Sequence, residues 1–175
     1  MTISQAILSS VNVMTYRMKG TLIYSFVLFF LIFGSPLFAK PIRVYVDVVG
    51  DLFHAGHVQF FEKAKAHGDY LIVGVHGDEA CTEYKRRPIL TLEERCTAIR
   101  ACRVVDEVIP NSPIGITEEW IQKHDIDLVI HGDDFTEEKK QSQYAVPIKM
   151  GIFRTVPYTP GISTTEILSR INSRS

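Results

Sequence analysis

Two histidines with a glycine between them, in the stretch HAGH, stand just after a run of apolar and β-branched residues, IRVYVDVV at 42–49. Such a run predicts a buried strand, and the spacing after it predicts a helix, so His54 and His57 lie at a strand-to-helix junction. Imidazoles there could pack in the core, bind a metal ion or hold phosphate groups. Gly56 lets the backbone approach a bound group, and the free amides of a helix N-terminus attract anions.

A zinc site is the weaker alternative, because no third and fourth ligand with suitable spacing stands near the pair. A phosphate fits the junction better. Imidazole rings beside it could donate hydrogen bonds to phosphoryl oxygens and stabilise the charge that develops in a phosphoryl or nucleotidyl transfer. The spacing alone is also compatible with two histidines that pack in the core or lie in an exposed loop.

The elements that could position the pair are short β-branched runs that alternate with segments of helical spacing, a pattern typical of a parallel sheet. Expected strands lie at 42–49, 70–75, 104–109, 127–132 and 153–158, and expected helices at 57–66, after Thr91, at 117–124, at 142–150 and from Ser163 to Ile171. Thr91 with Glu94 and Ser163 with Glu166 have the spacing of a capping box. This pattern predicts one α/β domain with a five-stranded, doubly wound (Rossmann-like) parallel sheet, whose ligands gather at the carboxyl ends of the strands.

The composition limits the class of protein. With 175 residues, 46% of them apolar, the chain can bury one ordinary core. Its 19 basic and 20 acidic side chains give a formal net charge of -1, which argues against the broad cationic surface of a nucleic-acid-binding protein. The three cysteines, Cys81, Cys96 and Cys102, have no metal-type spacing, and their odd number favours reduced thiols over a disulfide framework.

An N-terminal extension, residues 1–40, precedes the domain expected at 41–175. Its residues 20–39 carry no charge and are nearly free of polar groups. At ~1.5 Å per residue, a helix of this length covers roughly the hydrocarbon core of a bilayer. The segment is interpreted as a signal anchor that attaches the protein to a membrane, with a cleaved secretory signal or a true start site further downstream as alternatives.

Two motifs at opposite ends of the domain resemble those of a known family. HAGH matches the H-x-G-H signature of a nucleotidyltransferase superfamily, and GISTTEI at 161–167 is similar to the motif with which its cytidylyltransferase branch opens the last helix. The stretches DLFHAGH, GDYLIVGVHGDE, PILTLEER, VDEVIP and DLVIHGDD look most like ethanolamine-phosphate cytidylyltransferases, with the choline-phosphate and glycerol-3-phosphate enzymes as relatives. The resemblance runs from about Arg43 to Ile171.

The resemblance implies roles for four side chains. In that family the paired histidines bind the triphosphate and stabilise the transition state at the α-phosphate, which makes His54 and His57 the expected catalytic residues. Lys85 matches a lysine that reaches the phosphates of both substrates, and it is expected to be catalytic and substrate-binding. Arg95 matches an arginine near a helix start and is expected to bind substrate.

The nucleotide-binding residues that the resemblance implies lie in the loop after the first strand, the turn after the fourth strand and the start of the last helix. They are Val48, Val49, Asp51, Gly56, Asp133, Asp134, Gly161, Ile162, Ser163, Thr164 and Thr165. The aspartates at 133 and 134 are expected to hold nucleoside hydroxyls or Mg²⁺, although aspartates after a glycine are also ordinary turn residues. The hydroxyls and free amides at the helix start would bind phosphates.

The sequence departs from the family pattern in two places. Family members usually carry G-x-F-D before the H-x-G-H, whereas residues 48–51 read Val-Val-Gly-Asp, which leaves the path of this loop open. Relatives tend to carry R-T-x-G before the last helix, whereas residues 158–161 read Tyr-Thr-Pro-Gly and lack the arginine. Arg154, four residues earlier, is a candidate to reach the phosphates in its place.

The resemblance implies an enzyme that transfers CMP from CTP to a phosphorylated small alcohol, with phosphoethanolamine as the favoured acceptor, and releases pyrophosphate, in phospholipid head-group synthesis. Mg²⁺ is expected to be bound through the nucleotide with no metal held by the protein alone, and relatives imply a homodimer. Because CTP is an intracellular metabolite, the domain is expected to face the cytoplasm, or to be cytoplasmic if the N-terminal segment is not translated. The alternatives are glycerol-3-phosphate or choline phosphate as acceptor, an adenylyltransferase, or a catalytically weak, membrane-tethered phospho-ligand-binding protein.

Overall fold

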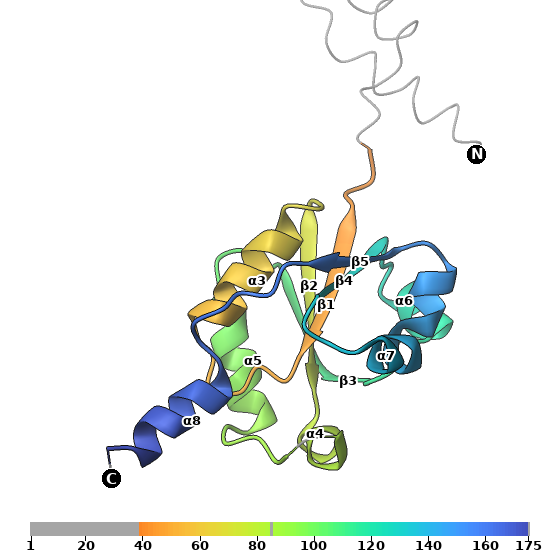
Figure 1. Ribbon diagram of the computed structural model, residues 1–175. Coiled ribbons are helices and arrows are strands. Elements are labelled where there is room, and N and C mark those ends of the chain that lie inside the picture. Colours follow the sequence, from red (N-terminus) through yellow and green to blue (C-terminus); the bar gives the residue numbers. More distant parts are fainter. Residues whose placement is uncertain (1–38, 85, 175) are drawn as a thin grey trace, which may run out of the picture. The chain divides into compact units, whose positions relative to one another are not determined.

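A five-stranded parallel sheet forms the centre of the domain in the computed structural model, which describes residues 39–84 and 86–174 (Figure 1). The strands are β1 (Arg43–Val48), β2 (Tyr70–His76), β3 (Glu107–Ser112), β4 (Leu128–Gly132) and β5 (Phe153–Val156). Their order across the sheet is β3-β2-β1-β4-β5, and every neighbouring pair is parallel. The predicted α/β fold with a five-stranded parallel sheet is therefore confirmed.

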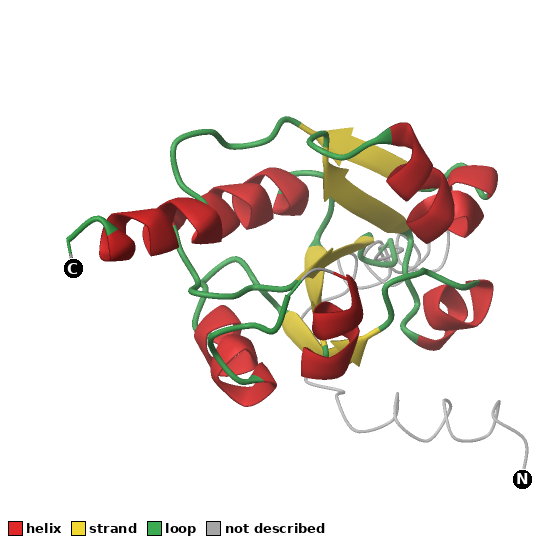
Figure 2. Ribbon diagram, turned by 60° about the horizontal axis from the view of Figure 1, so that its bottom comes forward, coloured by secondary structure: helices red, strands yellow, loops and turns green. Residues whose placement is uncertain are grey.

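Helices cover both faces of this sheet (Figures 1 and 2). They are α3 (Ala55–Lys65), α4 (Asp78–Tyr84), α5 (Leu92–Arg100), α6 (Glu118–Lys123), α7 (Glu137–Lys149) and α8 (Thr164–Asn172). Successive side chains of a strand point to opposite faces. Val46 of β1 accordingly lies in one hydrophobic core with Phe61 of α3 and Ile99 of α5. Its neighbour Tyr45 lies in a second core with Ile121 of α6 and Tyr144 of α7.

The strand order reverses beside β1. From β1 the chain moves outward to β2 and β3, then returns to place β4 on the other side of β1, with β5 beyond it. In open α/β sheets, ligands bind in the crevice at such a reversal, outside the carboxyl ends of the strands. The two strands at the reversal end at Val48 and Gly132, directly before the segments that carry HAGH and the aspartate pair.

The strand β3 begins later than the run at 104–109 predicts. Val104 and Val105 pack against the first hydrophobic core from a turn rather than from the strand. The carboxylate of Asp106 accepts a hydrogen bond from the amide of Leu71 at 2.6 Å, which ties this turn to the start of β2. A β-branched pair can therefore enter a core before its strand starts.

Two helices differ from the sequence-based expectation. Helix α4 occupies a segment where no helix was expected. Its seven residues are too few to show a clear helical period in the sequence. Helix α7 begins earlier than residue 142, since the Thr136 side chain accepts a hydrogen bond from the Lys139 amide and caps a polar first turn. Non-helical backbone angles at Tyr144 bend α7 before Pro147.

The N-terminal extension lies almost wholly outside the described residues, whereas the C-terminal helix α8 is described in full. Residues 20–38 of the segment predicted as an anchor lie outside the described residues. In the part from 39 to 174, with residue 85 left out, no helix combines the length and the apolar character that crossing a membrane requires. At the other end, α8 runs away from the sheet in both views and buries none of its residues (Figure 2).

Candidate active site

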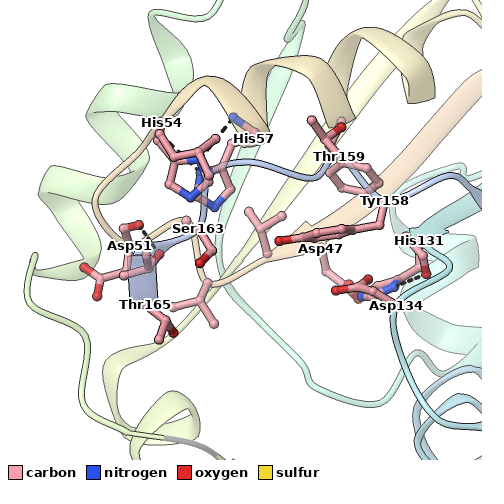
Figure 3. Close-up of a pocket in the computed structure, with 18 of the residues that line it drawn as sticks. Asp47, Asp51, His54, His57, His131, Asp134, Tyr158, Thr159, Ser163 and Thr165 are labelled. Carbon is pink, nitrogen blue, oxygen red and sulfur yellow. Dashed lines mark hydrogen bonds between the residues drawn. The ribbon is translucent and has the colours of Figure 1, made fainter. Parts of the chain in front are cut away.

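A cavity of about 300 Å³ opens at the carboxyl ends of β1 and β4. It is lined by the end of β1 with its following loop, the start of α3, the loop before α5, the end of β4, and the segment from β5 into α8. Figure 3 shows two sides of this cavity, a histidine side with Asp51, His54, His57, Ser163 and Thr165 and a β4 side with Asp47, His131, Asp134, Tyr158 and Thr159. The reversal of strand order thus brings together segments from both ends of the domain.

The two histidines cap the helix that they open. His54 is the N-cap residue of α3, and its Nδ1 accepts a hydrogen bond from the amide of Gly56 at 3.1 Å. In return, the amide of His54 donates to Nδ1 of His57 at 3.3 Å. A ring nitrogen that accepts a hydrogen bond from an amide carries no proton, so each neutral ring has its hydrogen on Nε2. The pair has the spacing of a capping box, with imidazoles in place of the usual hydroxyl and carboxylate.

Both imidazoles are uncharged at neutral pH. Burial lowers the pKa of His54 from its usual value of 6.5. Burial, and next the adjacent His54 ring, lower the pKa of His57 to about 4, while Asp51 opposes this shift. The two ring centroids are 4.0 Å apart, and Phe53 stacks on His57 with centroids 5.5 Å apart. The pair therefore offers a ligand two N–H donors rather than two positive charges.

Gly56 lies where HAGH meets the segment that leads into α8. A Cβ atom on this residue would stand 2.9 Å from Cε1 of the His54 ring and 3.2 Å from the carbonyl oxygen of Ile162. A side chain at this position would force the His54 ring or the Ile162 carbonyl to shift. The two motifs that carry the family resemblance are therefore in contact, as a common phosphate site requires.

Hydroxyl groups surround the start of α8. Ser163 is its N-cap, as predicted, and its Oγ accepts a hydrogen bond from the amide of Glu166 at 3.1 Å. Thr164 Oγ1 donates to the carbonyl oxygen of Asp51 at 2.9 Å, which joins this helix to the loop after β1. Both residues line the cavity together with Thr165. Because the first amides of a helix have no partner within the helix, this end can bind an anion.

Asp51 connects three parts of the site. Its side chain is 4% exposed, and its carboxylate accepts hydrogen bonds from the amides of Ile89 and Leu90 at 3.0–3.1 Å. Arg86 Nη2 lies 3.6 Å from its Oδ2. The residue lines the cavity, as expected of a nucleotide-binding residue, but its carboxylate mainly fixes the loop before α5.

The loop after β1 follows a path that the displaced glycine makes possible. Gly50 has a φ of +70°, a conformation that side chains disfavour, and a Cβ atom there would come within 2.7 Å of Cδ1 of Ile99. Val48 and Val49, expected near the nucleotide, both line the cavity. The carbonyl oxygen of Val49 accepts a short hydrogen bond from Nη1 of Arg95. The altered motif therefore still forms a defined loop.

Arg95 occupies a different position from the one expected of a substrate-binding residue. It is fully buried outside the cavity lining, where its Nε donates to the Leu90 carbonyl at 3.2 Å and its Nη2 pairs with Asp78 at 2.5 Å. A buried guanidinium cannot reach a ligand without leaving these partners unsatisfied. The contacts of Arg95 therefore hold the loops around the cavity in place. Lys85, the other residue expected to contact substrate, lies outside the described residues.

The remaining expected residues divide between the cavity and its supporting loops. Asp134 and Ile162 line the cavity. Asp133 lies outside the lining, and its Oδ1 accepts a hydrogen bond from the amide of Tyr158 at 2.8 Å, so it shapes the segment after β5. Gly161 has a φ of +99° and provides the turn before α8.

Sequence reasoning missed most of the β4 side. Asp47 of β1 is 4% exposed; its Oδ1 accepts a hydrogen bond from the hydroxyl of Tyr144 at 2.5 Å, and its Oδ2 is buried without a hydrogen-bond partner among the described residues. The ring of His131 packs against Tyr144 with centroids 5.3 Å apart. Further missed lining residues are Gly50, Phe60, Arg86, Pro88, Gly132, Pro157, Tyr158 and Thr159. A carboxylate inside the apolar run IRVYVDVV was the signal that could have revealed Asp47.

Comparisons with known proteins agree with this geometry. A family model described as Cytidylyltransferase-like matches residues 50–170. The chain is 42% identical to the ethanolamine-phosphate cytidylyltransferase of Arabidopsis thaliana, over 73% of this chain and 32% of that protein. It is 40% identical to the choline-phosphate cytidylyltransferase of Saccharomyces cerevisiae, over 79% of this chain and 34% of that protein.

A solved structure shares the fold. The lipopolysaccharide core biosynthesis protein from Thermoplasma volcanium GSS1 matches with a TM-score of 0.56 and 28% identity, over 70% of this chain and the whole of that chain. This chain spans about a third of the length of the curated relatives it matches. The matched region contains the paired histidines, the start of α8 and every lining residue of the cavity except Asp47, Val48 and Val49. The chain belongs to the cytidylyltransferase-like family.

Proposed function

We propose that this chain transfers a cytidylyl group from CTP to ethanolamine phosphate and releases pyrophosphate. Relatives that are 38–42% identical are named ethanolamine-phosphate cytidylyltransferase, and others at 38–40% are named choline-phosphate cytidylyltransferase. The observation that carries the proposal is the contact between HAGH and the segment before α8, made at Gly56 and the carbonyl oxygen of Ile162. This contact groups the imidazole donors and the helix N-terminus around one cavity.

In the proposed reaction, an oxygen of the acceptor phosphate attacks the α-phosphorus of CTP in line. A new P–O bond joins the acceptor to the cytidylyl group, the bond from the α-phosphorus to the bridging oxygen breaks, and pyrophosphate leaves with that electron pair. No covalent intermediate with the protein is needed. Because charge is redistributed among phosphate oxygens, positioning and preorganised hydrogen-bond donors supply most of the catalysis.

The histidine side would hold the triphosphate. Nε2–H of His54 and of His57 would donate to oxygens around the α-phosphate, and the capping hydrogen bonds fix both rings for this task before the substrate arrives. The hydroxyls of Ser163 and Thr165 and the amides at the start of α8 would hold the leaving phosphates. Lys85 keeps its predicted role as a cation that reaches both substrates.

The β4 side favours an acceptor that carries an ammonium group. Asp47 lines the cavity with a buried carboxylate oxygen that lacks a hydrogen-bond partner among the described residues. Such an orphan acceptor costs free energy until a donor satisfies it. The primary ammonium of ethanolamine phosphate provides both the charge and the N–H donor, whereas a quaternary ammonium provides only the charge and glycerol phosphate only a neutral hydroxyl. This reasoning supports ethanolamine phosphate over the other acceptors.

We also propose that Mg²⁺ reaches the site with the nucleotide. In the described ranges no group of three or more His, Cys, Asp or Glu side chains is arranged to hold a metal ion. Asp134 lines the cavity, and a single carboxylate together with substrate phosphates is a common way to bind Mg²⁺. When bound, the ion would neutralise charge on the triphosphate.

A pyrophosphate-release assay tests the function. The full chain is supplied with CTP or ATP, each with ethanolamine phosphate, choline phosphate or glycerol 3-phosphate, in the presence of Mg²⁺. The proposal expects the highest kcat/KM for CTP with ethanolamine phosphate. Faster turnover with ATP would overturn the donor, faster turnover with another acceptor would overturn the acceptor, and nucleotide binding without product would favour the phospho-ligand-binding alternative. The homodimer and the membrane attachment through residues 20–39 stay predictions.

A further inference from the structure

The charged side chains that line the cavity do not neutralise the negative charge of a triphosphate. The lining carries three carboxylates, Asp47, Asp51 and Asp134. Its paired histidines are neutral at pH 7, because burial lowers the pKa of both rings. Arg86 is the only lysine or arginine among the lining residues that the structure describes. A nucleoside triphosphate carries several negative charges, so this guanidinium is the permanent cation that the described wall can offer it.

Arg86 is held loosely. Its Nη2 lies 3.6 Å from Oδ2 of Asp51, beyond the ~2.7–3.2 Å of a hydrogen bond, and its side chain is 39% exposed. Arg95 shows the opposite arrangement, with no exposure and with hydrogen bonds to fixed partners. A guanidinium offers five N–H donors in a planar fork that matches phosphate oxygens. Arg86 can therefore turn toward a ligand, whereas Arg95 cannot.

The site keeps its shape when Arg86 leaves Asp51. The Asp51 carboxylate retains the hydrogen bonds from the amides of Ile89 and Leu90, so it is not left without partners. Its carbonyl oxygen retains the hydroxyl of Thr164, so the start of α8 stays attached. Moving Arg86 exchanges one long ion pair for charge-assisted hydrogen bonds to phosphate, which are about twice as strong as neutral ones.

Arg154, the other candidate cation, is engaged elsewhere. Its Nη1 donates to the carbonyl oxygens of Gly151 and Phe153 at 3.1 and 2.7 Å, and it lies outside the lining. Residues 158–161, which precede α8, contain no arginine. Resting on the function proposed above, we propose that Arg86 leaves Asp51 and binds the β- and γ-phosphate oxygens of the nucleotide, opposite the start of α8.

Binding of CTP and of CMP to the full chain, measured by calorimetry, tests this assignment. Arg86→Ala should weaken CTP binding by ~10- to 100-fold, the range typical of a lost hydrogen bond to a charged group. CMP lacks the β- and γ-phosphates, so its affinity should change by no more than about twofold. Arg87→Ala removes the same charge one residue further on, outside the lining, and serves as the matched control.

Three results would overturn the assignment: an unchanged CTP affinity in Arg86→Ala, an equal loss of CTP and CMP affinity, or an equal loss in Arg87→Ala. Thermal unfolding of each variant shows whether the fold is intact. The proposed function fails separately, because a wild-type chain that does not bind CTP refutes the donor itself and this inference with it. A wild-type chain that binds CTP while Arg86→Ala binds it equally well refutes only the role of Arg86.

Discussion

Replacing His57 by alanine removes a donor and a helix cap at once. Loss of one oriented donor to a transition-state phosphate costs ~3 kcal/mol in the barrier, which corresponds to ~100-fold in kcat. The same change removes the acceptor at Nδ1 for the amide of His54, a contact of 3.3 Å, and costs about 1 kcal/mol in the free energy of unfolding. We therefore expect a large loss of turnover and a small loss of stability.

Two further variants separate these effects. Glutamine at position 57 can accept from the His54 amide and donate from its own amide group, so His57→Gln should regain the cap and part of the activity. His67→Ala changes an exposed histidine outside the cavity lining and should leave kcat unchanged. Pyrophosphate release at saturating substrates gives kcat, and thermal unfolding gives stability. A folded His57→Ala variant that turns over as fast as His67→Ala would refute the donor role.

Four further predictions concern the same cavity. Because both histidines act as neutral donors, kcat should stay level from pH 8 down to about 7. A kcat that declines as the pH rises through this range would show that the charged form is needed. His57 takes up a proton near pH 6.5 in the unfolded chain, but only near pH 4 in the folded chain. The free energy of unfolding should therefore fall by about 3 kcal/mol as the pH drops from 6.5 to 4. This pH dependence should become weaker in His57→Gln. Asp47→Asn should raise KM for ethanolamine phosphate by ~10- to 100-fold with little change in KM for CTP, measured beside Tyr144→Phe, which spares the carboxylate. Gly56→Ala should lower kcat by ~10- to 100-fold while thermal unfolding changes little, since its Cβ would separate His54 from the carbonyl of Ile162, and unchanged kinetics would contradict the close contact.

The fold could be predicted largely from local patterns. Buried parallel strands need continuous β-branched runs, and the chain has five of them separated by helical spacing. The caps at Thr91 and Ser163 were readable because a hydroxyl three residues before a glutamate is a local signal. The late start of β3 could not be predicted from the sequence. An apolar pair such as Val104 and Val105 indicates that the residues are buried, but it does not indicate whether their backbone pairs with a neighbouring strand.

The site could be predicted only in part, because sequence gives the type of a side chain but not its partners. HAGH and the start of α8 carry their geometry locally, and both line the cavity. Arg95 and Asp133 have suitable chemistry for ligands, yet the fold uses their polar groups for loop contacts. Conversely, Asp47 is a carboxylate inside an apolar strand, which is a local signal, but the structure is needed to show that its Oδ2 has no hydrogen-bond partner among the described residues.

The two imidazoles at this helix start use their two ring nitrogens for different tasks. A serine and a glutamate with the same spacing would cap α3 equally well, but the carboxylate would repel a triphosphate. In His54 and His57, Nδ1 satisfies the amides of the first turn and thereby fixes the hydrogen on Nε2. The low pKa of His57 keeps this arrangement neutral. The contacts that stabilise the helix thus also orient the donors, so the stability of α3 and the chemistry of the site depend on the same two hydrogen bonds.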